Sequence, residues 1–146
     1  MLNVKSIMLR LEKLDDCLTQ LRNLQKLALD EYRKNNLVQG STERYFQVAI
    51  ECCTDIASHL IAAYGLRRPA GRKDVFKVLG EAGYLEEDYA RTMVQMVQLR
   101  NRLVHLYWDI NAEKMYGYLQ KDLVFLEKFK VFALAAVEEE RARAAG

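Results

Sequence analysis

The sequence YARTMVQMVQLRNRLVHLY, residues 89–107, decides the fold and contains the first candidate for a functional site. Its apolar side chains recur every three or four residues, which is the period of one face of an α-helix. Arg100 occupies a position in this apolar row where a further apolar residue is expected. An isolated buried charge is very costly, so the Arg100 guanidinium must be paired, hydrated or used by the protein. The apolar row consists of Tyr89, Met93, Met96, Leu103 and Tyr107.

Helical periodicity continues over the rest of the chain, which contains one proline and seven glycines and so has few helix breakers. We predict an all-α fold, an antiparallel bundle of four to five helices in a single domain over residues 1–146. Ser41 or Thr42 is the expected N-cap of the second helix, and Asp74 that of the third. The expected helices cover about 4–34, 42–64, 74–82, 86–107 and, starting from Asp109 or Asn111, the rest of the chain to a charged tail at 138–143.

The first predicted helix has an apolar seam with heptad-like spacing, and two interpretations of it remain open. The seam packs into the core of its own chain, or it faces a second subunit in a dimer. The seam residues are Ile7, Leu11, Leu14, Leu18 and Leu21.

Composition narrows the class of protein. The apolar fraction of 51% and the charged fraction of 29% are ordinary for a globular domain. A net charge of +2 neither requires nor excludes a nucleic-acid partner.

The three cysteines lack the spacing of a zinc site and fit a reducing compartment. No signal peptide or membrane-spanning run occurs, so we expect a cytoplasmic protein that does not contact membranes. With two histidines and no Gly-rich phosphate loop, we predict neither a metal site nor a cofactor.

Four cations lie within seven positions in the one obvious loop of the chain. These residues are candidates for contacts with phosphate groups of RNA, although a solvated charged loop is the commoner outcome. They are Arg67, Arg68, Arg72 and Lys73.

Arg100 and His105 supply two groups suited to breaking a phosphodiester without a metal ion. An imidazole transfers protons near neutral pH, and a guanidinium stabilises charge on phosphorus. Five residues separate them, which places them roughly 140° apart around a straight helix. Either the arginine side chain curls back, the helix loosens near its end, or the groups meet across a subunit interface. Asn101 and Arg102 share the histidine face and are expected to orient or charge it. The alternative is a lone surface histidine among solvated arginines.

His59, the other histidine, follows Asp55 by four residues, and that carboxylate is a potential hydrogen-bond partner. A histidine satisfied in the core or at its boundary is the simpler interpretation, and a supporting catalytic role is the alternative.

The stretch RNRLVHLY, residues 100–107, resembles the R-x4-H-x-Y motif of the HepT-like toxins, a branch of the HEPN superfamily. The stretches 43–51 and 55–59 resemble the second helix of that family. The loop with Pro69, the turn at 75–79 and Gly83 are also similar, so the resemblance covers nearly the whole chain.

This resemblance implies a dimeric helical bundle that acts as a metal-independent endoribonuclease, the toxin of a toxin–antitoxin pair. The implied partners are RNA, a second copy of the chain, and a MntA-like nucleotidyltransferase antitoxin, alone or in a larger hetero-oligomer. By position, Arg100 and His105 would be catalytic, and Tyr107 would be the tyrosine to which the antitoxin attaches AMP. Two alternatives remain: a non-catalytic helical subunit that binds a nucleotidyltransferase and its substrate, and a purely structural dimeric bundle.

Overall fold

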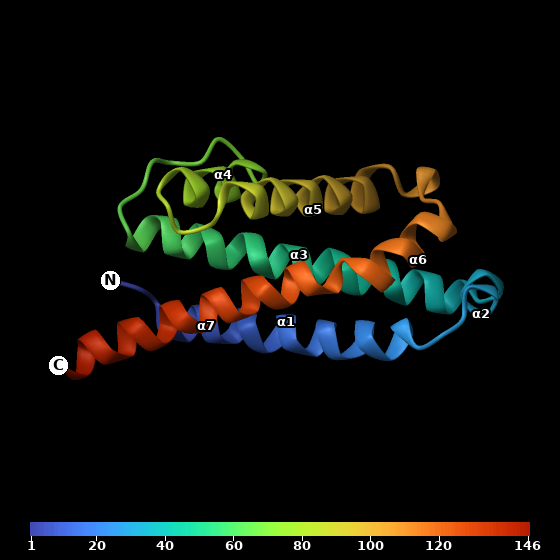
Figure 1. Cartoon of the computed structure of the whole chain (residues 1–146), viewed down its shortest axis with the longest axis horizontal. Helices are drawn as coiled ribbons and strands as arrows, with labels where there is room; N and C mark the ends of the chain where they lie inside the picture. Colours follow the sequence, from blue (N-terminus) through green and yellow to red (C-terminus); the bar gives the residue numbers. More distant parts are fainter.

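A computed structural model describes all 146 residues as a bundle of α-helices without a β-strand (Figure 1). The long helices α1, α3, α5 and α7 run alternately in opposite directions, and both chain ends therefore lie at the same end of the bundle. The predicted all-α antiparallel bundle is confirmed, although the structure contains more helices than the predicted four to five. The elements are α1 (Val4–Gln25), α2 (Leu29–Lys34), α3 (Asn36–Ala63), α4 (Asp74–Glu81), α5 (Glu87–His105), the 3-10 turn η1 (Tyr107–Asp109), α6 (Ala112–Lys121) and α7 (Leu123–Ala145).

The predicted helix over residues 4–34 is wrong because the chain breaks after α1 and restarts as α2. At the break Ala28 is extended, with φ −70° and ψ 155°. The Tyr116 hydroxyl of α6 donates to the carbonyl of Leu27 over 2.6 Å, and the Gln25 side chain donates to the carbonyl of Leu119 over 2.9 Å. These contacts with a distant helix accommodate the break, and local periodicity cannot reveal them.

The predicted start of the second long helix is also wrong. Helix α3 begins at Asn36, and its N-cap is Asn35, whose Oδ1 accepts from the backbone N–H groups of Leu37 and Val38. The predicted cap Thr42 lies inside the helix, where its hydroxyl donates to the carbonyl of Val38. An early N-cap of good chemistry outweighs the weak helix preference of the glycine at position 40.

Two further boundaries differ from the prediction. Asp74 is the first residue of α4 rather than its N-cap, and its carboxylate accepts from the loop instead of from the helix. The predicted last helix is divided at Asp122 into α6 and α7. Asn111 caps α6 as expected, with its Oδ1 accepting from the backbone N–H of Lys114.

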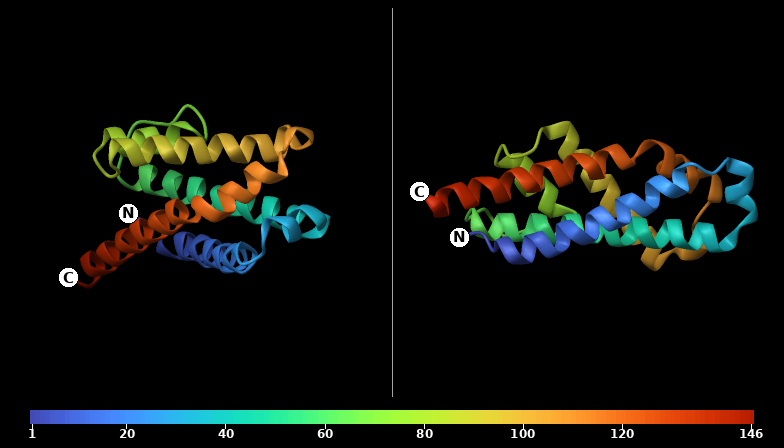
Figure 2. Two further views of the ribbon diagram at one scale, coloured as in Figure 1. Left: turned by 45° about the vertical axis from the view of Figure 1, so that its right-hand side comes forward. Right: turned by 90° about the horizontal axis from the view of Figure 1, so that it is seen from below.

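The core lies between the long helices and contains the apolar seam of α1, all of whose residues are buried. The seam therefore packs into the core of its own chain, which settles the alternative left open by the sequence. In Figure 2, α7 continues past the bundle, and its last residues are exposed. No helix combines the length and the apolar character needed to span a bilayer.

Helix α4 is held tightly against the bundle, which matters because it borders the candidate site. Phe76 packs edge-on against Phe129 of α7, with ring centroids 5.5 Å apart. At Gly80, an added Cβ would lie only 3.0 Å from the Cβ of Ala90 in α5. The absence of a side chain at Gly80 permits this close approach of α4 to α5.

Candidate active site at the end of α5

Arg100 faces the interior of the bundle and is 8% exposed, as its position in the apolar row predicts. Its Nε and Nη2 both lie 2.7 Å from Oε2 of Glu51 in α3. Its Nη1 donates to Oδ1 of Asn101 over 3.2 Å. The buried guanidinium is therefore paired, and charge-assisted bonds of this kind fix its orientation. The guanidinium carries five N–H groups, so its two hydrogen bonds, to Glu51 and Asn101, do not use all of them.

Glu51 is the site residue that sequence reasoning missed. It also accepts from Nε2 of Gln47 over 3.3 Å, so its own carboxylate is oriented from within α3. The sequence does require a partner for Arg100, since an unpaired charge in the apolar row is costly. It does not say which of the 20 acidic residues provides that partner.

His105 is the last residue of α5 and is exposed. The helix ends here and does not continue to Tyr107, so Arg100 and His105 both lie on continuous α-helix while Tyr107 follows it. The guanidinium of Arg100 is held in the interior while the His105 ring lies at the surface. Asn101 accepts from Arg100 and lines the same surface hollow as His105. Arg102, the other supporting candidate, is half-buried, and its Nη2 lies 3.9 Å from Oδ2 of Asp109.

The hollow at His105 has a volume of about 550 Å³ and is open to solvent. Its lining includes Arg72 and Lys73 of the basic loop, Lys77 of α4, and one acid, Asp74. The structure thus brings two of the four predicted RNA-binding cations to the histidine.

The other two cations of the basic loop lie outside this hollow. Arg68 is exposed and forms no ion pair. Arg67 forms ion pairs with both Asp74 and Glu81.

Tyr107, the third motif residue, lies in η1 and is 68% exposed. Its ring packs edge-on against that of Trp108, with centroids 5.3 Å apart. The hydroxyl forms no hydrogen bond within the chain, so an approaching enzyme can reach this side chain.

His59 and the three cysteines lie outside the hollow at His105. Asp55 pairs with Arg10 over 3.4 Å and forms no hydrogen bond with His59. All three cysteines are buried, and burial raises the pKa of Cys52 to about 12, which keeps its thiol protonated and unreactive. No cluster of three or more His, Cys, Asp or Glu side chains is placed to hold a metal ion.

The antiparallel helical bundle, with an arginine and a histidine in the last turns of α5 and a tyrosine just after it, agrees with the all-helical class that the motif indicated. The sequence profile of the family described as ribonuclease HepT-like matches residues 14–131, and the chain belongs to that family.

Two curated relatives are nucleases. The tRNA nuclease HepT of Aphanizomenon flos-aquae is 28% identical over 118 residues, which is 80% of each chain. The mRNA nuclease HepT of Shewanella oneidensis is 27% identical over 99 residues, covering 68% of this chain and 74% of the relative. The family predicted from the R-x4-H-x-Y motif is confirmed, and the predicted enzyme class agrees with the names of both relatives.

A solved structure with the same fold is the tri-AMPylated Shewanella oneidensis HEPN toxin in complex with MNT antitoxin. It superposes with a TM-score of 0.83 at 23% identity, covering 92% of this chain and 99% of that one. A toxin–antitoxin structure with AMP-PNP gives a TM-score of 0.81 at 22% identity and covers 91% and 99% of the two chains. At these identities the likeness establishes the common fold.

Proposed function

We propose that this chain is the toxin of a toxin–antitoxin pair, an endoribonuclease that cleaves RNA without a metal ion. The observation that carries the proposal is the arrangement at the end of α5. The buried, oriented guanidinium of Arg100 bonds to Asn101, and Asn101 lines the same basic hollow as the solvent-exposed imidazole of His105. The names of the two curated relatives support RNA as the substrate.

The proposed reaction is a transfer of the phosphoryl group within the RNA strand. His105 removes the proton of a ribose 2′-hydroxyl, whose oxygen attacks the adjacent phosphorus as the bond to the 5′-oxygen breaks. A proton reaches the departing 5′-oxygen, which leaves a cyclic phosphate on one fragment and a 5′-hydroxyl on the other. Arg100 stabilises the charge on phosphorus through N–H groups that are not bonded to Glu51 or Asn101.

A two-fold assembly of two chains would supply both the base and the acid. One copy of His105 would accept the proton of the 2′-hydroxyl, and the copy in the other subunit would protonate the leaving oxygen. A closed dimer presents the same surface twice, so one exposed histidine per chain suffices. Such a dimer would also bring together the arginine and histidine that one helix holds apart.

The antitoxin would be a MntA-like nucleotidyltransferase that neutralises the toxin by attaching AMP from ATP to Tyr107. The tyrosine oxygen would form a bond with the α-phosphorus of ATP, and pyrophosphate would leave. The exposure of the tyrosine supports this assignment. The added phosphate and nucleoside would obstruct RNA both by negative charge and by volume.

The experiment is cleavage of total tRNA and of mRNA by the purified protein in excess EDTA. We expect cleavage by the wild type and a loss of about 10²- to 10⁴-fold in His105→Ala. The matched control is His59→Ala, which changes the other histidine and should leave the rate unchanged. Equal cleavage by His105→Ala and the wild type would exclude the assigned role. A wild type that cleaves nothing yet binds the antitoxin would favour a non-catalytic partner subunit.

A further inference from the structure

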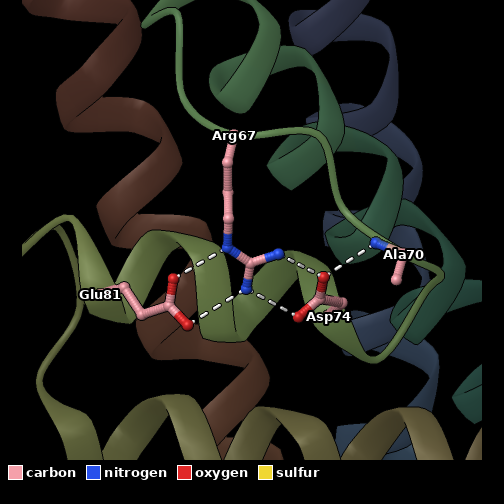
Figure 3. Close-up of polar contacts among 4 residues, drawn as sticks. All are labelled: Arg67, Ala70, Asp74 and Glu81. Carbon is pink, nitrogen blue, oxygen red and sulfur yellow. Dashed lines mark hydrogen bonds and ion pairs between the residues drawn. The ribbon is translucent and has the colours of Figure 1, made fainter.

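Arg67 is bound differently from the other cations around the basic loop. Its Nε and Nη2 donate to the two carboxylate oxygens of Glu81, over 2.9 and 3.1 Å. Its Nη1 and Nη2 donate to the two oxygens of Asp74, over 2.7 and 3.0 Å (Figure 3). Every nitrogen of the guanidinium is thus engaged. The remaining cations are all exposed and form no ion pair: Arg68, Arg72, Lys73 and Lys77.

These bonds form a clamp, composed of Arg67, Asp74 and Glu81, that ties the loop to α4. Asp74 is the first residue of α4 and Glu81 the last, so the arginine spans the helix from end to end. Asp74 also accepts from the backbone N–H of Ala70 over 2.8 Å, which fastens the middle of the loop. Two-pronged bonds between arginine and carboxylate are directional, so the clamp restricts the loop to one conformation.

The clamp also determines the charge of the hollow at His105. Three free cations line it, Arg72 and Lys73 from the loop and Lys77 from α4. The one acid on the lining, Asp74, is compensated by Arg67, which lies outside the lining. The hollow therefore presents positive charge to a ligand. Lys77 was not among the residues that the sequence singled out.

We propose that Arg72, Lys73 and Lys77 bind a phosphate of the RNA strand next to the linkage that is cut, and that Arg67 is a positioning residue that does not contact RNA. This inference rests on the proposed ribonuclease function. An acidic protein surface would also complement three cations. RNA is favoured because His105 and Asn101 line the same hollow, so its occupant lies against the proposed catalytic imidazole.

The clamp can be tested by the direction in which RNA affinity changes when one of its acids is removed. Removing an acid near a polyanion site ordinarily strengthens binding, because repulsion is lost. If the clamp orders the loop, Glu81→Ala will instead weaken RNA binding, since the cations lose their fixed positions. The matched control is Glu87→Ala, which removes an exposed acid of α5 on a neighbouring hollow that also includes Lys77. This control should leave binding unchanged or strengthen it slightly.

The experiment measures binding of a labelled single-stranded RNA to the full chain by fluorescence anisotropy at several salt concentrations. The His105→Ala background prevents cleavage. Each phosphate contact contributes about 0.7 to the slope of log affinity against log salt for single strands. We expect Lys77→Ala, an exposed change that does not disturb folding, to reduce the slope by about 0.7. Arg67→Lys should weaken binding although the charge is kept, and circular dichroism should show an intact fold.

The outcomes separate this inference from the proposed function. Stronger binding in Glu81→Ala, or an unchanged slope in Lys77→Ala, would overturn the phosphate site while leaving His105-dependent cleavage intact. A wild type without nuclease activity would overturn the proposed function, whereas the binding measurement would still be valid. An unchanged RNA affinity in Lys77→Ala together with a weakened antitoxin complex would assign the hollow to the protein partner and reject the inference.

Discussion

Glu51 of α3 holds the guanidinium of Arg100 in α5, with Oε2 of the glutamate 2.7 Å from both Nε and Nη2 of the arginine. The arginine side chain is 9% exposed and that of the glutamate 31%, so solvent screens this pair only in part. The Glu51 carboxylate compensates the charge of Arg100 within the apolar row of α5. It also fixes the orientation of the guanidinium and hence the direction of its remaining N–H groups.

Glu51→Gln should therefore affect both stability and activity. The amide keeps the shape of the carboxylate but removes the charge that compensates Arg100. A hydrogen bond to a charged group contributes about 1.5–3 kcal/mol, so we expect a loss near the lower end of that range in urea unfolding. RNA cleavage should fall as well, because the guanidinium is no longer held in place.

The control is Glu113→Gln, which breaks the exposed pair with Arg33, whose side chains are 52% and 45% exposed. Solvent screens a surface pair of this kind, so this variant should lose less stability than Glu51→Gln and should retain its activity. Equal losses of stability in the two variants would show that the Glu51 pair is no stronger than an ordinary surface contact.

Tyr107→Phe should separate toxicity from neutralisation. The ring and its contact with Trp108 remain, so RNA cleavage should continue, while the oxygen that accepts AMP is lost. Intact-mass spectrometry after incubation with ATP and the antitoxin should show AMP-sized additions on the wild type only. Tyr84→Phe, at another exposed tyrosine, should still be modified. Modification of Tyr107→Phe to the wild-type extent would place the acceptor elsewhere.

The sequence predicts the fold class and most of the site because both depend on local patterns. The period of the apolar residues predicts the helices, and Arg100 within an apolar row predicts a buried charge. The breaks at Ala28 and Asp122 were missed because neither carries a proline or glycine. Glu51 and Lys77 were missed as site residues for a different reason. Each acquires its role from a helix that is distant in sequence and adjacent only in the folded chain.

The clamp should make stability depend on acid pH. Hydrogen bonds from Arg67 lower the pKa of Asp74 from 3.8 to about 2, and they also lower the pKa of Glu81. A carboxylate with a lowered pKa in the folded state stabilises that state fully above its unfolded pKa. The contribution declines as the pH falls from about 4 towards 2, where the folded carboxylate is finally protonated.

The measurement is the Tm of the wild type and of Arg67→Met between pH 2 and 7. We expect a constant difference in favour of the wild type above about pH 5.5, because both carboxylates are then ionised in the folded and the unfolded states. The difference should shrink at lower pH. A difference that stays the same down to pH 2 would mean that the arginine stabilises the chain through packing and not through its ion pairs.

The close approach of α4 to α5 gives a prediction about how the hollow is built. Gly80→Ala places a methyl group 3.0 Å from the Cβ of Ala90, which belongs to a helix and cannot rotate away. The helices must separate, and overpacking of this kind costs about 1–3 kcal/mol, more than the gain from replacing glycine in a helix. Because Lys77 lies one turn earlier on α4, RNA affinity should fall with stability.

The control is Gly117→Ala, where an added Cβ meets no atom within 4 Å. That variant should be stabilised by about 0.5–1 kcal/mol, with unchanged RNA affinity. If Gly80→Ala proves as stable as Gly117→Ala, the contact between α4 and α5 is looser than the structure indicates, and the position of Lys77 does not depend on it.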